Sequence, residues 1–144
     1  MIVHNSMESC IIHVESRNYA YLAVEGFIDS KKTKEFAEKL VSLCLHNKIG
    51  MIMFDSSKLS VIKPTDMEWI FEQVLQPLRY CSIDKVAFLM PESTFGIVSV
   101  KKLIQHIENC STGIFRNIEQ AETWLFKSTS ADNTASKISP KASA

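Results

Sequence analysis

Acidic and hydroxyl side chains gather after the apolar run at residues 51–54, where Asp55 is followed directly by Ser56 and Ser57. The end of a strand in an α/β protein is a common place for functional groups. Asp55 could bind a metal ion or act as a base, but no second carboxylate lies close to it in the sequence. The alternative is a structural Asp that shapes a turn by accepting backbone hydrogen bonds from Ser57 or Lys58.

A second polar group lies further along the chain, where the next predicted helix starts at Thr65. Thr65 and Ser57 are candidate phosphoacceptors, because the N-terminus of a helix favours an added anion. Thr65 and Glu68 also match a capping box, in which both side chains bond to backbone N–H groups, and this structural role is the alternative. We expect a partner protein to contact the surface around this linker, whose candidate residues are Asp55, Ser56, Lys63 and Asp66.

The patterns that accompany catalysis, cofactors or metals are missing from the sequence. No Ser lies in a Gly-x-Ser-x-Gly elbow, and the four glycines are isolated, which argues against a phosphate-binding loop. The four histidines are scattered, and the cysteines form no Cys-x-x-Cys pair of the kind found in zinc sites. We therefore predict no enzymatic activity, no cofactor and no metal site. Thiols among apolar neighbours indicate a reducing, cytoplasmic location.

Aromatic residues raise the alternative of an apolar binding site. Trp69, Phe88 and Phe95 could line a pocket for a small hydrophobic, lipid-like ligand, although aromatic residues at such spacing usually form only core. Phe95 differs from the others, since it follows Pro91 in a loop or helix entry, where an exposed ring would suggest a gate or a partner contact. A sizeable cavity beside these residues would favour a ligand carrier, and a filled core would favour an interaction domain.

The length and the composition of the chain indicate one domain with balanced charge. The chain has 144 residues, which suits a single core, and its 16 basic residues balance 16 acidic ones. A neutral chain has no electrostatic reason to bind nucleic acid. No apolar run reaches the roughly 18–20 residues that a membrane span needs. The first residues also lack the pattern of a signal peptide.

Short segments rich in β-formers predict the strands. Residues 10–16 and 19–26 are joined by so few residues that they must pair as an antiparallel hairpin, with residues 2–6 as a further edge strand. Residues 51–54 and 85–90 are continuous apolar runs, which favour central strands that are covered on both faces. A short last strand is expected at residues 113–117.

Periodic apolar residues predict about four helices. The first covers residues 31–46, the second begins near Thr65 and is bent or ended by Pro77, the third follows Pro91, and the last covers residues 119–127. Strands that alternate with helices need parallel, right-handed connections. The predicted fold class is α/β: a mixed β-sheet with an N-terminal antiparallel hairpin, then parallel β-α-β units, backed by the helices.

The composition changes after Lys127. Residues 128–144 are rich in Ser, Thr and Ala and contain one large apolar residue, so they cannot bury enough surface to offset the entropy of ordering. We predict one domain over residues 1–127, followed by a disordered tail over residues 128–144.

Several short segments carry a resemblance when their order and spacing are taken together. They are residues 26–30, 54–59, 65–69, 85–91, 95–99 and 119–125. In this arrangement the chain resembles the SpoIIAA-like branch of the STAS superfamily, a group of small bacterial domains, over roughly residues 19–126. The resemblance implies a mixed sheet backed by helices, and no known catalytic set.

In the related anti-sigma-factor antagonists, an Asp-Ser-Ser-Gly motif opens the helix that follows such a strand, and a partner kinase phosphorylates its second Ser. The resemblance places Thr65 at that position, while Lys63, Pro64 and Asp66 replace the other motif residues. The carboxylate of Asp66 would repel a phosphate beside it. We therefore expect a non-catalytic regulatory or protein-interaction domain in which the phosphorylation motif is altered. The alternative is a carrier or sensor of a small hydrophobic ligand, bound between sheet and helices.

Overall fold

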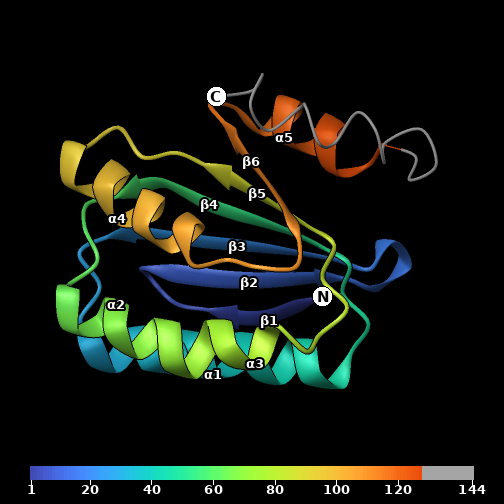
Figure 1. The fold of residues 1–144 in the computed structure, drawn as a ribbon, viewed down its shortest axis with the longest axis horizontal. Coiled ribbons are helices and arrows are strands. Elements are labelled where there is room, and N and C mark those ends of the chain that lie inside the picture. Colours follow the sequence, from blue (N-terminus) through green and yellow to red (C-terminus); the bar gives the residue numbers. More distant parts are fainter. Residues whose placement is uncertain (128–144) are drawn as a thin grey trace.

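Six strands form one mixed sheet in the computed structural model, which describes residues 1–127 (Figure 1). They are β1 (Ile2–Asn5), β2 (Ser9–Val14), β3 (Tyr19–Gly26), β4 (Met51–Leu59), β5 (Lys85–Leu89) and β6 (Ser111–Phe115), and they lie side by side in that order. The first three strands are antiparallel neighbours, and β3 to β6 run parallel. The predicted α/β fold class is confirmed. The predicted tail at residues 128–144 lies outside the described residues.

Helical segments connect the parallel strands. They are α1 (Ser30–His46) between β3 and β4, α4 (Thr94–Gln105) between β5 and β6, and, between β4 and β5, the run of α2 (Pro64–Ile70), the π-helical turn η2 (Phe71–Leu75) and α3 (Gln76–Leu78). A short 3-10 turn, η1 (Glu15–Arg17), links β2 to β3, and α5 (Ile118–Leu125) follows β6.

The order of the strands decides where the helices lie. Because the parallel strands follow one another in a single direction across the sheet, right-handed connections place every crossover helix on the same face. Among the helices of residues 1–127, α5, which comes after the last strand, is the one left to cover the other face. Figure 1 shows α5 across the sheet from α1 and α2.

The sheet divides the core into two clusters. In the larger cluster, Ile52 and Phe88 of the sheet pack with Leu40 of α1. In the smaller cluster, on the opposite face, Met53 of the sheet packs with Trp124 of α5. Adjacent residues of β4 therefore enter different clusters, so this strand is covered on both faces, as its continuous apolar run predicts.

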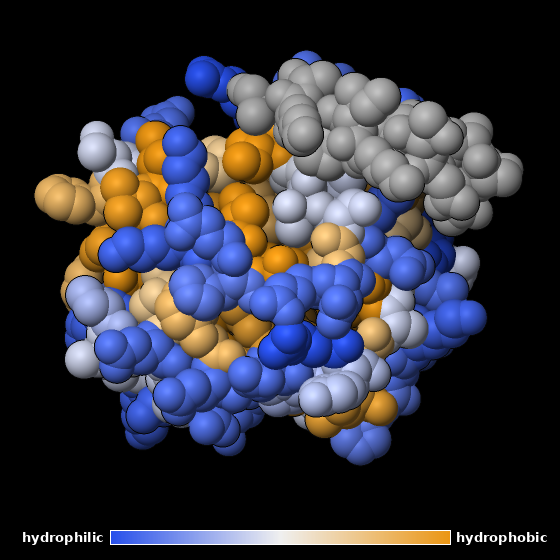
Figure 2. All heavy atoms as spheres, viewed as in Figure 1, coloured by the Kyte–Doolittle hydropathy of each residue, from blue (hydrophilic) through white to orange (hydrophobic). Residues whose placement is uncertain are grey.

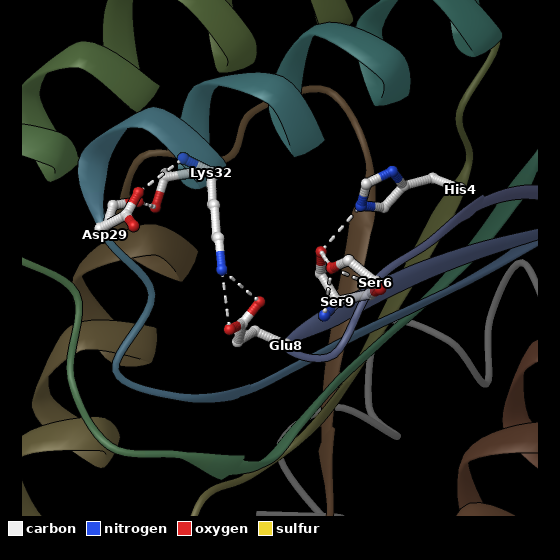
Figure 3. A network of polar contacts seen from close by, with 7 residues as sticks. His4, Ser6, Glu8, Ser9, Asp29 and Lys32 are labelled. Carbon is white, nitrogen blue, oxygen red and sulfur yellow. Dashed lines mark hydrogen bonds and ion pairs between the residues drawn. The ribbon is translucent and has the colours of Figure 1, made fainter.

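The turn between β1 and β2 is tied to the start of α1 (Figure 3). The N-cap residue Asp29 accepts a hydrogen bond from the backbone N–H of Lys32 at 2.9 Å. The Lys32 Nζ lies 3.0 and 3.2 Å from the two carboxylate oxygens of Glu8. Nearby, the His4 Nε2 lies 2.9 Å from the Ser9 Oγ. The Lys32–Glu8 ion pair thus links the first turn of α1 to the hairpin, while the His4–Ser9 contact lies within the hairpin.

Two local predictions near β4 are wrong. The strand continues to Leu59 rather than ending before Asp55, because an irregularity in its pairing with β3 lets the two strands stay together beyond that residue. The capping box of Thr65 and Glu68 is absent among the described contacts, since the N-cap residue is Lys63 and no side chain caps the helix. Pro64 occupies the first helical position, where its missing N–H costs nothing.

Pro77 ends its helix as predicted. Proline lacks an N–H and its ring clashes with the carbonyl four residues earlier, so the chain cannot keep regular α-helical bonding there. The structure accommodates Pro77 with the π-helical turn η2 directly before α3, and the helix ends at Leu78. Such π-turns often lie at functional sites.

Candidate functional site

A cavity of about 220 Å³ lies between the sheet and the helices that cover the larger cluster. Leu22, Ile52 and Phe88 line it from the sheet, Ala37 from α1 and Val74 from η2. In Figure 2, hydrophobic side chains are visible between polar ones in the region that separates α4 from the α2–α3 segment. A recessed, mainly apolar space with few polar groups is the usual form of a small-molecule site.

The cavity extends along the α2–α3 segment. Asp66, in the first turn of α2, and Arg79, directly after α3, both line it. At the usual rise per residue, the helical chain between these two residues extends about 20 Å. The cavity is therefore elongated, and its two ends differ in chemistry.

Surface side chains line the cavity at the Arg79 end. Arg79 forms an ion pair with Glu108, and the His106 ring stacks on the Phe71 ring with centroids 3.7 Å apart. Arg79, Glu108 and His106 also line the cavity. Because exposed side chains change rotamer quickly, a ligand could enter here without a change in the fold.

Asp66 brings a carboxylate to the other end. The residue is 5% exposed and lines the cavity. Across residues 1–127, its side chain has no hydrogen bond and no ion pair. Buried carboxylates are normally paired, so this is an unusual position.

The linker between β4 and α2 is held by α4 near the same end. The Ser93 Oγ donates to the carbonyl of Leu59 at 3.3 Å, and the Ile62 N–H donates to the Ser99 Oγ at 3.0 Å. Gly96 permits this approach, because a Cβ there would lie 2.7 Å from the Leu59 carbonyl oxygen. Leu59 and Ile62 line the cavity, so these contacts shape its wall. The sequence indicates these contacts only through the small and hydroxyl residues at the start of α4 and within it.

Of the three aromatic residues expected to line a pocket, the structure places one at the cavity. Phe88 lines it. Trp69 is half-buried and lies outside the lining, with the Lys34 Nζ 5.7 Å from its ring centroid. Phe95 is 74% exposed at the start of α4, so its ring lies on the surface.

Asp55 has the structural role that the sequence left as the alternative. Its Oδ1 accepts hydrogen bonds from the Ser57 N–H at 3.1 Å and the Ser57 Oγ at 2.6 Å. The Tyr21 hydroxyl donates to its Oδ2 at 2.6 Å. Burial, with help from this hydrogen bond, raises the pKa of the Tyr21 phenol, so the phenol keeps its proton. The Asp55 carboxylate is thus held by three donors.

Two of the four residues of the predicted partner surface are buried in the structure. Ser56 is fully buried and donates to the Leu89 carbonyl at 2.7 Å, because β4 continues past it. Asp66 is also buried, at the cavity rather than at the surface. Lys63 is half-buried, with its Nζ 5.3 Å from the Phe27 ring centroid.

The two candidate phosphoacceptors differ in accessibility. Thr65 is exposed in the first turn of α2. Ser57 is half-buried, and its hydroxyl donates to Asp55. A kinase could reach Thr65 more readily, because its side chain is open to solvent.

The thiols behave as apolar side chains. All four cysteines are free, and Cys81 and Cys110 line the cavity. Burial raises the pKa of the Cys110 thiol to about 11 and that of Cys44 to about 12, so both are protonated at neutral pH.

In the described part of the chain, no three His, Cys, Asp or Glu residues come together as a metal site. Nor does any helix there have the length and hydropathy to cross a membrane.

Comparison with models of protein families gives no match to this chain, and comparison with curated proteins gives none either. The fold class is therefore supported by the structure itself. The resemblance to the SpoIIAA-like branch stays a prediction.

Proposed function

We propose that this domain binds a small apolar molecule in the cavity between sheet and helices, as a non-catalytic carrier or sensor. The observation that carries the proposal is the cavity itself, with its volume of about 220 Å³ and its mainly aliphatic lining. An engineered apolar cavity of about 150 Å³ binds benzene. By that proportion, this cavity accommodates a ligand of about nine non-hydrogen atoms.

The energetics of packing support the same function. Protein interiors are close-packed, and an empty cavity costs roughly 24 cal/mol per Å³. The enclosed, apolar part of this cavity carries such a cost, because its lining side chains lack packing partners on one side. A ligand that fills the space recovers part of this free energy. The cavity thus favours the carrier, which the sequence left as the alternative, over the interaction domain.

Calorimetric titration with octan-1-ol, a ligand of about the right size, tests the proposal. We expect saturable binding to one site in the wild-type protein. Ala37→Leu should weaken it about tenfold, because the added carbons occupy part of the volume. Glu38→Leu is the matched control on the exposed face of α1 and should bind normally. A wild-type protein that takes up no octan-1-ol up to its solubility limit would contradict the proposal.

A regulatory protein-interaction role is the second candidate, and the exposure of two aromatic side chains favours it. Phe27 is 58% exposed in the loop after β3, and Phe95 is 74% exposed at the start of α4. Exposed aromatic rings are available for contact with another protein, and Thr65 is also accessible. The free thiols support a cytoplasmic location for either function.

Affinity purification from the native cell tests this second role. A partner that is retained by the wild type and lost on Phe27→Ser with Phe95→Ser, or on Thr65→Glu, would support it. An identical set of partners for all variants would count against it.

A further inference from the structure

Asp66 distinguishes this cavity from a simple gap in the core. It is 5% exposed, it lines the cavity, and its side chain has no partner within residues 1–127. In the same part of the chain, only His13 Nδ1 and Trp124 Nε1 are fully enclosed and unpaired side-chain atoms. The Asp66 carboxylate oxygens are therefore still accessible to a small molecule.

The chemistry of a carboxylate limits what can bind it. An ionised carboxylate only accepts hydrogen bonds, so the group that completes it must be a donor. Asp66 brings this carboxylate to the cavity from the first turn of α2. A hydroxyl or an ammonium group would satisfy Asp66, and a second anion would be repelled.

The other charged groups of the cavity do not reverse this preference. Arg79 forms an ion pair with Glu108, and its Nη1 also lies 3.4 Å from the Gln76 Oε1. Its charge is therefore already balanced, at the opposite end of the cavity from Asp66. Among the described lining residues, an anionic head group finds a paired cation, while a donor head group finds an unpaired acceptor.

We propose that Asp66 binds the head group of an amphiphilic ligand, and that this head group is a hydrogen-bond donor, an ammonium or a hydroxyl. The apolar part is a slim aliphatic chain of about eight carbons, since the volume is small and spread along the α2–α3 segment. Binding places the head at the start of α2 and the chain end toward Arg79. This inference rests on the proposed function and gives its ligand a chemical class.

Calorimetric titrations with octylamine, octan-1-ol and octanoate at neutral pH test the inference on the wild-type protein. We expect octylamine to bind at least about tenfold more tightly than octanoate, because hydrogen bonds to charged groups contribute more than neutral ones. Octan-1-ol should lie between them. This comparison uses only the wild type, so it does not depend on whether a variant folds.

The variant Asp66→Asn keeps the shape of the side chain and removes its charge. We expect it to weaken octylamine binding about tenfold and to change octan-1-ol binding by less than about threefold, because an amide oxygen still accepts from a hydroxyl. Glu68→Gln is the matched control, since it removes an exposed acid from the same helix. It should leave both affinities unchanged.

The outcomes separate the two proposals. Octanoate binding that equals octylamine binding would overturn the role of Asp66, and so would equal losses in Asp66→Asn and Glu68→Gln. In either case, saturable octan-1-ol binding would leave the proposed function in place. If none of the three compounds binds, both proposals fail.

Discussion

Filling the cavity from α1 tests its existence through protein stability. Ala37 is 5% exposed and lines the cavity, and Ala37→Leu adds three carbons to the side chain. At about 0.8 kcal/mol for each buried carbon group, an empty space would give a gain of about 2 kcal/mol. Ala and Leu have similar helix propensities, so the change reports packing. The midpoint of thermal unfolding should rise by about 5 °C.

The matched control is Ala121→Leu in α5. Ala121 is fully buried in the smaller cluster and lies outside the cavity, so a larger side chain there overpacks the core and destabilises by about 1–3 kcal/mol. Urea unfolding followed by circular dichroism gives both free energies, provided that the slope with urea is unchanged. If Ala37→Leu destabilises the protein as much as the control does, the space is already filled and there is no empty cavity beside Ala37.

Three further predictions concern the framework around the cavity. Ser56→Ala should lower the free energy of unfolding by about 1–3 kcal/mol in urea, because the buried Leu89 carbonyl loses its donor. Gly96→Ala should cost about 1–3 kcal/mol by the same assay, and an unchanged midpoint would contradict the close approach of α4 to β4. Burial, followed by the charge of Lys39, lowers the pKa of His4 below 6.5, so protonation favours the unfolded chain and stability falls below about that pH. His4→Asn should therefore lose less stability than the wild type between neutral pH and about pH 5.

The sequence pattern predicted the elements well where one physical signal dominates. β3 covers residues 19–26 as expected, since alternating β-formers run between Asn18 and Gly26. α1 was expected at residues 31–46 and begins one residue earlier, at Ser30. In these segments local propensity and burial point to the same structure.

The candidate site was harder to predict, because its residues depend on tertiary contacts. In the sequence, Ser56 is a polar residue just after a predicted strand. Its burial is explained only by the continued pairing of β4 with β3. An Asp in a first helical turn is typical of a solvated position, so nothing local indicates that Asp66 faces a cavity. The start of α2 at Pro64, rather than after a Thr65 cap, also changes which residues face inward.

The cavity itself has no signature in the sequence. Its lining residues, such as Ala37, Val74 and Phe88, have the same periodicity as an ordinary core. Periodicity shows which side chains point inward, but it does not show whether the side chains of sheet and helix meet. That depends on the distances between elements, which three-dimensional packing sets.

Nuclear magnetic resonance of the methyl-labelled protein with octan-1-ol shows whether the ligand binds in the cavity. We expect intermolecular nuclear Overhauser effects between the ligand and methyl groups of Leu40 and Val74, which line the cavity. None is expected to Leu125, which lies in the cluster on the opposite face of the sheet. Contacts to Leu125 but not to Leu40 or Val74, or no contacts at all at saturating octan-1-ol, would contradict binding in the cavity.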